Sequence, residues 1–143
     1  MADGSVFARV HVLILCDDVE EFSNGEELFD LRGVRTQVSA SSFPYVHPQL
    51  CIYLQITGHA GIASGRIVVV HEASDEESFQ VPIEEFQLSG PLDVIPMWVR
   101  ISDCEFPEPG VYWFEVFLNE KLVSERRFRV IASSGEHNGQ STH

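Results

Sequence analysis

Four of the six histidines and all three cysteines lie in the body of the chain, where they could bind a metal or act as acids, bases or nucleophiles. No two of them have the short spacing of a structural zinc motif. If the strands run up and down in turn, His47 and His59 stand at opposite ends of a strand over 49–57. At about 3.3 Å per residue they are roughly 30 Å apart and cannot share a metal ion. The seven residues are His11, His47, His59, His71, Cys16, Cys51 and Cys104.

That separation leaves one group of polar residues at each predicted end of the fold. The group that contains Asp17 and His59 is the better candidate for a cation site, because a carboxylate-rich loop supplies the oxygen ligands that Ca²⁺ prefers. No stretch has the alternating Asp/Asn pattern with a central Gly of an EF-hand, so a solvated acidic loop remains the favoured interpretation. The metal candidates are Asp17, Asp18, Glu20 and His59, with Glu21, Glu84 and Glu85 at the same predicted end.

The second group could form a hydrolytic site in which His47 and His71 work with nearby carboxylates. A histidine next to a proline, as in "YVHP", is more typical of a packed loop residue. We therefore assign no catalytic residue and no cofactor, and we favour a protein that is not an enzyme. The members of the group are His47, His71, Glu72, Asp75, Asp103, Cys104 and Glu105.

The sequence also lacks an activated nucleophile. It has no Gly-x-Ser-x-Gly elbow. Cys16 follows an apolar strand and precedes two carboxylates, a setting that raises the pKa of a thiol and favours a buried structural cysteine. Gly58, Gly61 and Gly65 lie in a loop-like stretch that lacks the lysine of a phosphate-binding loop.

Length and charge restrict the class of protein. A chain of 143 residues with 44% apolar residues suits a single globular domain. The net charge of −13 disfavours nucleic acid and anionic membranes as partners and leaves room for a basic partner. The one basic cluster, Arg126, Arg127 and Arg129, is expected to neutralise nearby carboxylates. With no signal peptide and no membrane-length apolar run, we expect a cytoplasmic protein with reduced cysteines.

The apolar pattern predicts about eight short strands and no long amphipathic helix. The clearest strand covers 49–57, where every second residue from Leu50 to Ile56 is apolar. Evenly spaced strands of this kind favour an all-β fold, an antiparallel β-sandwich that is immunoglobulin-like or related. Acidic 17–27 and glycine-rich 58–65 are expected to be loops. The expected organisation is an N-terminal arm over 1–7, a single β-sandwich domain over 8–132 and a disordered polar tail over 133–143.

The stretch "FPEPGVYWFEVFLNEKLVSERRFRVI" at 106–131 combines a Pro-Gly corner with two strands. Tyr112 stands where a corner tyrosine of an immunoglobulin-like fold hydrogen-bonds back to the backbone. Asn119 and Glu120 predict a two-residue hairpin turn. The alternating face places Phe114, Val116 and Leu118 with Tyr112 in the core. The opposite face carries Trp113 and Phe117, which with Trp98 form the candidate interaction surface.

Four stretches carry a resemblance to a known family: "LILCDDV", "LFDLRGV", "SFPYVHPQLCIYLQITG" and "FPEPGVYWFEVFLNEKLVSER". In this order they resemble a bacterial family of small all-β proteins that is described only as a domain of unknown function. The resemblance covers most of 8–131. It implies a sandwich-type β-domain and implies no reaction, cofactor or catalytic residue.

The favoured function is a non-catalytic protein-interaction or self-assembly module. An exposed strand edge can accept a strand from a partner or from a second copy. The run that bears Pro96 and the short strand over 77–82 are the expected edges. The alternatives are a small-molecule or carbohydrate-binding protein with a groove around Trp98 and Trp113, and a metal-assisted hydrolase that uses His47 and His71.

Overall fold

The computed structural model describes residues 8–22 and 27–133, and these residues form strands and no helix. The predicted arm over 1–7 and all but the first residue of the predicted tail lie outside the described residues. The strands are β1 (Ala8–Phe22), β2 (Leu28–Val34), β3 (Gln37–Ala40), β4 (Tyr45–His71), β5 (Glu76–Phe106), β6 (Gly110–Leu118) and β7 (Lys121–Ala132).

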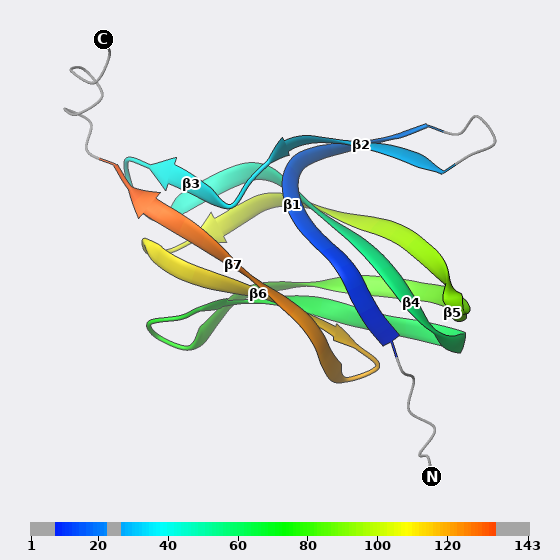
Figure 1. Cartoon of the computed structure of the whole chain (residues 1–143). Helices are drawn as coiled ribbons and strands as arrows, with labels where there is room; N and C mark the ends of the chain where they lie inside the picture. The colour runs from blue at the N-terminus through cyan, green and yellow to red at the C-terminus, as the bar shows by residue number, and fades with distance from the viewer. Residues whose placement is uncertain (1–7, 23–26, 134–143) are drawn as a thin grey trace.

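All seven strands belong to one open hydrogen-bonded sheet (Figure 1). Its order is β2-β1-β4-β6-β7-β3, and β5 pairs with the remaining edge of β4. The sheet is mixed, because β3 and β7 run parallel while the other pairs run antiparallel. The prediction of an all-β fold is confirmed. The finer prediction of an immunoglobulin-like sandwich with eight strands is not, since the described part forms seven strands in one sheet.

The long hairpin of β4 and β5 organises the sheet. One edge of β4 pairs with β5 from end to end, and the other pairs first with β1 over 51–58 and then with β6 over 65–71. The prediction of a loop over 58–65 is therefore wrong. Its glycines mark register shifts in a continuous strand, where a bulge bends the chain without reversing it. At Gly65 the backbone of Phe117 passes so close that an added Cβ would lie 1.8 Å from its carbonyl oxygen.

Side chains from both halves of β4 meet in one core. Leu50, Ile52, Leu54 and Ile56 are fully buried, as the alternating pattern predicts, and Ile67 from the second half lies in the same cluster. The bent sheet thus brings its two halves against each other. Aromatic rings fill the space between them at centroid distances of 5.0–6.3 Å; these rings belong to Phe79, Phe106, Tyr112, Phe114 and Phe128.

The corner before β6 has the predicted structure. The Tyr112 hydroxyl donates a hydrogen bond to the Glu108 carbonyl at 2.5 Å and accepts one from the Glu108 N–H at 3.2 Å. Tyr112, Phe114 and the other inward residues of β6 are buried. Asn119 and Glu120 both have positive φ and close the β6–β7 hairpin as a two-residue turn.

Beyond Cys16, β1 leaves β4 and pairs with β2. We call the paired residues 17–22 and 28–34 the β1–β2 ribbon (Figure 1). The prediction of a loop from residue 17 onward is wrong up to Phe22, because pairing with β2 keeps the acidic stretch extended. Gly33 lies at the base of the ribbon with a φ of 68°, and a Cβ there would lie 2.7 Å from Asp17 Oδ2. Glycine adopts this φ without strain and leaves room for the Asp17 carboxylate.

Candidate interaction surfaces

The bent sheet has two outward faces. The ribbon face is the outer side of β4 and β5 around Tyr53 and Trp98, and the open face is the outer side of β6 and β7 around Trp113 and Phe117. The predicted surface is therefore divided between two sides of the molecule. Trp98 lines a groove with other residues of β5, whereas Trp113 lines a separate hollow with residues of β7. The alternation of side chains predicted that each residue faces outward, but local sequence does not show which residues share a face.

On the ribbon face, the chain covers its own apolar residues. Cys16 and Cys51 are completely buried, and Val19, Phe29 and Leu31 of the ribbon pack in the same cluster with Trp98. The ring centroids of Phe29 and Tyr53 lie 5.5 Å apart. The guanidinium of Arg100 lies 4.7 Å from the Trp98 ring centroid and donates to Asp18 at 3.1 Å. Trp98 thus has structural partners on this face.

Asp17 anchors the base of the ribbon. Arg35 donates to both carboxylate oxygens, at 2.6 and 2.9 Å, and His47 Nε2 lies 3.2 Å from Oδ1. The Tyr45 hydroxyl completes the network at 2.8 Å from His47 Nδ1. The bonds from Arg35, reinforced by His47, hold the pKa of Asp17 below its usual value, although partial burial opposes them. The network joins β1, the segment after β2, and the start of β4.

The structure does not bring the metal candidates together. Asp17 and Asp18 lie where β1 leaves β4, whereas His59 follows Gly58, which pairs with Ala8 at the other end of β1. About ten extended residues, roughly 30 Å, separate the two places. The prediction assumed that successive loops alternate between ends, but β1 pairs with β4, so the end of β1 meets the start of β4. In the described ranges, no three His, Cys, Asp or Glu side chains are grouped to hold a metal ion.

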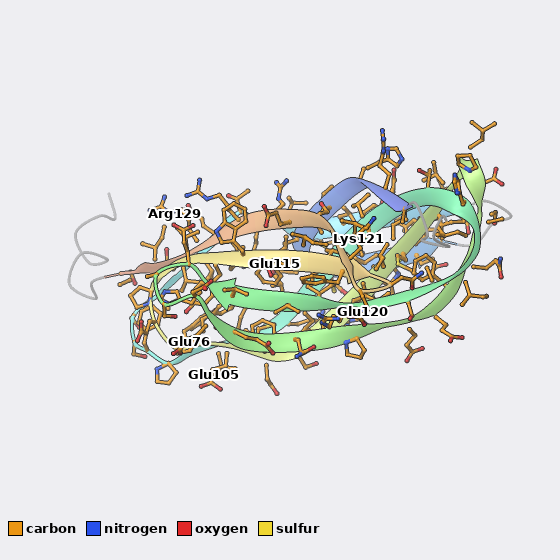
Figure 2. The ribbon with its side chains drawn as sticks, turned by 90° about the horizontal axis from the view of Figure 1, so that it is seen from below. Glu76, Glu105, Glu115, Glu120, Lys121 and Arg129 are labelled. Carbon is orange, nitrogen blue, oxygen red and sulfur yellow. The ribbon has the colours of Figure 1, made fainter. Side chains whose placement is uncertain are left out.

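The proposed hydrolytic histidines have structural roles as well. Both are buried, and both ring nitrogens of each have a partner. His47 contacts Asp17 and Tyr45, and His71 contacts the Ser74 hydroxyl and the Pro109 carbonyl, each at 3.2 Å. His71 and Glu105 do line one pocket of about 250 Å³, near the end of the molecule where Figure 2 shows Glu76 and Glu105. Four glutamates in all line this pocket, but both ring nitrogens of its histidine already have hydrogen-bond partners.

All three cysteines are buried and unpaired. Cys16 lies directly opposite Cys51 in the register of β1 and β4. Burial raises the pKa of Cys16 to about 11 and that of Cys104 to about 12. The expectation that Cys16 has a raised thiol pKa is confirmed, and such a thiol is a poor nucleophile at neutral pH.

Within the described residues, no ribbon covers the open face. The indole N–H of Trp113 donates to Glu72 Oε1 at 2.7 Å, and the guanidinium of Arg127 lies 5.7 Å from the indole centroid. Phe117 is covered in the same way by Arg66, at 4.6 Å. Both rings remain partly exposed. Figure 2 shows Glu115 on β6 and Arg129 on the neighbouring strand β7.

The arginines of the two faces differ in their pairing. On the ribbon side, Arg32 pairs with Glu20, Arg35 with Asp17, and Arg100 with Asp18. In the part of the chain that the structure describes, no carboxylate pairs with the cluster of Arg126, Arg127 and Arg129. The expectation that this cluster neutralises neighbouring carboxylates is not met by any ion pair.

β5 presents the longest unpaired strand edge in the described residues. It pairs only with β4, over the 31 residues from Glu76 to Phe106. Both edges expected from the sequence, at 77–82 and around Pro96, belong to this strand. Because β5 bends with β4, its two halves border a groove of about 350 Å³. The lining combines apolar side chains with two carboxylates: Pro82, Ile83, Glu84, Glu85, Phe86, Met97, Trp98 and Val99.

A bulge next to this groove presents apolar side chains to solvent. Between the pairs Ile56↔Ile95 and Gly58↔Gly90, four residues of β5 oppose one residue of β4. Within the bulge, Leu92 is 93% exposed and Val94 is 49% exposed. Leu92 and Val94 thus add exposed apolar side chains to the strand that carries the unpaired edge.

The sequence from residue 11 to 131 matches the model of DUF6941, a family of unknown function. The chain therefore belongs to this family. The match covers the same span as the resemblance derived from the four stretches, and it assigns no activity. No curated protein matches this sequence.

Among solved structures, the fold is similar to part of the Pseudomonas fluorescens alkylpurine DNA glycosylase AlkC bound to DNA containing an abasic site analog. The TM-score is 0.57 with 8% sequence identity, over 87% of this chain and 30% of the glycosylase chain. At this identity the likeness concerns the fold alone. The described residues include no helix long and apolar enough to cross a membrane.

Proposed function

We propose that this protein is a non-catalytic interaction module that takes an extended segment of a partner protein onto the free edge of β5. The observation that carries the proposal is the single pairing of β5, combined with the groove beside its edge. Backbone hydrogen bonds along a strand edge supply affinity, and an adjoining pocket for alternate side chains supplies specificity.

The residues 97–102 are the best docking edge. Prolines at 82, 91 and 96 interrupt the earlier part of β5, and Asp103 has a positive φ. A proline lacks the N–H that a partner strand would use, which protects those positions from pairing. Residues 97–102 contain neither feature, and Met97 and Val99 from this run line the groove.

Charge favours a basic partner over a second copy of this chain. Glu84 and Glu85 line the groove, and each copy carries a net charge of −13. Two copies would repel each other as they approached, whereas a segment with Lys or Arg beside its apolar residues would be attracted. We propose a partner segment that alternates apolar with basic residues.

Selection of peptides on the whole protein tests this proposal. Phage-displayed random dodecapeptides are selected against the immobilised chain. Amide hydrogen exchange of the protein then shows where the enriched peptides bind. We expect alternating apolar and basic sequences that slow amide exchange at 97–102. Phe86→Ser should weaken binding about tenfold or more, whereas Leu122→Ser, an exposed apolar residue at the β6–β7 hairpin, should leave it unchanged.

Three results would contradict the proposal. One is the absence of enriched peptides, and another is protection confined to strands other than β5. The third is a dimer, detected by sedimentation, in which the amides of 97–102 become exposed when the dimer dissociates. This result would mean that a second copy of the chain occupies the edge. Melting temperatures of the variants establish that they remain folded.

A further inference from the structure

A groove separate from the one beside β5 lies on the open face, between β7 and β3. Its volume is about 440 Å³, and its lining contains two arginines. No carboxylate lines it, although Asp and Glu make up 22 of the 143 residues of the chain. The lining residues are Thr36, Gln37, Val111, Arg127 and Arg129.

The strand register places Arg127 and Arg129 in neighbouring rows on the same face of the sheet. Arg129 pairs with Val111 on one side and with Gln37 on the other, and Arg127 pairs with Trp113 in the next row on the same face. Residues two apart on a strand are separated by roughly 7 Å. Carboxylates at alternate positions of an extended peptide have the same spacing, so one such peptide can reach both arginines.

Neighbouring groups prepare these arginines for an anion. The guanidinium of Arg127 lies over the Trp113 ring, which restricts the arginine side chain without neutralising it. Neither Arg127 nor Arg129 forms an ion pair with a carboxylate of the described residues, whereas Arg32, Arg35, Arg66 and Arg100 each do. Because no carboxylate of the described residues occupies an ion-pair position on either arginine, an incoming carboxylate pair could bind both guanidinium groups.

We propose that this groove binds an extended acidic segment of a partner protein, with carboxylates at alternate positions paired to Arg127 and Arg129. The carboxylates of Glu115 and Glu125 occupy the next row of the open face. They would repel a long polyphosphate that ran across β6 and β7, and the net charge of −13 adds to this repulsion. A short acidic peptide segment avoids the repulsion from Glu115 and Glu125 and the repulsion from the net charge. The site is separate from the β5 edge and does not depend on it.

Fluorescence anisotropy on the whole protein tests the site. The probe is a labelled decapeptide of alternating Thr and Glu, and its counterpart of alternating Thr and Gln controls for backbone binding. We expect saturable binding of the Glu peptide alone, weakened as salt rises from about 50 to 150 mM. In the double variant Arg127→Gln/Arg129→Gln, the dissociation constant should rise about tenfold or more.

A charge-matched variant separates the site from general electrostatics. Arg32→Gln/Arg66→Gln removes the same net charge from two other exposed arginines and should change affinity less than about twofold. Equal weakening by both double variants, or no binding of the Glu peptide to the wild-type protein, would overturn the proposal. Tighter binding of a ten-nucleotide thymidine oligomer would also overturn it, in favour of a phosphate site. Melting curves establish that both double variants remain folded.

Discussion

The two outward faces of the sheet are built from the same kind of strand but are completed differently. On the ribbon face, residues of β1 and β2 cover Cys16 and Cys51 and pack beside the partly exposed Trp98, and Arg32, Arg35 and Arg100 each form an ion pair. On the open face, arginines lie over the partly exposed rings of Trp113 and Phe117, and neither Arg127 nor Arg129 forms an ion pair with a carboxylate of the described residues. The chain thus uses its own segment to bury one face, and the composition of the other is suited to an external partner. The difference indicates that an outward-facing aromatic residue is a candidate for binding a partner only where no other segment of the chain packs over it.

The largest expected effect comes from breaking the base of the ribbon. Gly33→Val places a Cβ against Asp17 at a φ of 68°, which β-branched residues strongly disfavour. We expect a loss of about 2–3 kcal/mol in the free energy of unfolding, measured by urea denaturation. Thiol titration should then show faster labelling of Cys16 and Cys51, with Cys104 unchanged. A variant as stable as the wild type would show that the ribbon does not depend on this turn.

The two tryptophans provide the most direct comparison of the faces. Trp98→Ala removes a side chain that packs under the ribbon and should cost about 2 kcal/mol. Trp113→Ala removes a ring from the uncovered face and should cost about 0.5–1 kcal/mol. Both values follow from chemical denaturation with an unchanged slope against denaturant. Equal losses would mean that the two faces are equally buried.

Asp17→Asn weakens the network at the ribbon base and adds a pH dependence. Because the folded-state pKa of Asp17 lies below its ordinary value of 3.8, the carboxylate stabilises the fold above that value. This contribution is lost as the pH falls through the folded-state pKa. The carboxylate is 37% exposed, so we expect a loss of only about 1 kcal/mol at pH 7. The wild type and the variant should converge once the pH is below the folded-state pKa, and a constant difference across the titration would contradict this account.

Glu115→Gln should have the smallest effect and the opposite sign. Partial burial and the facing carboxylate of Glu125 raise the pKa of Glu115, so its ionised form destabilises the fold. That cost is present at neutral pH and disappears as the pH falls and the carboxylate is protonated. Glu115→Gln should therefore stabilise the protein by a few tenths of a kcal/mol at pH 7 and by less at pH 4. Destabilisation at pH 7 would show that Glu115 has a favourable partner.

Features of the fold with a local cause were predictable from the sequence. Alternating apolar residues predicted the core faces of β4 and β6, and the Asn119–Glu120 pair predicted the hairpin turn. The corner at Tyr112 was also predictable, because its hydrogen bond spans only four residues. The match to DUF6941 agrees with the resemblance in the same stretches.

Features that depend on long-range pairing were not predictable in this way. Glycines at 58–65 are equally compatible with a loop and with bulges in a continuous strand. Pairing with β5 makes this stretch a continuous strand. The contact of Asp17 with His47 requires β1 to pair with β4, which no local pattern specifies. The groove beside β5 arises because two distant parts of one bent strand approach each other. The strand pairing also decides which strands carry the residues of the candidate surface, and single-residue alternation does not specify that pairing.

Amide hydrogen exchange of the wild-type protein, resolved by residue, tests the central claim that β5 has an unpaired outer edge in solution. In an edge strand, every second N–H points away from the neighbouring strand and exchanges with solvent. The account predicts alternating fast and slow exchange along 97–102, independent of protein concentration, beside uniform protection in 51–56 of β4. Uniform protection along 97–102 in dilute protein would mean that this edge is already covered, and would contradict the account.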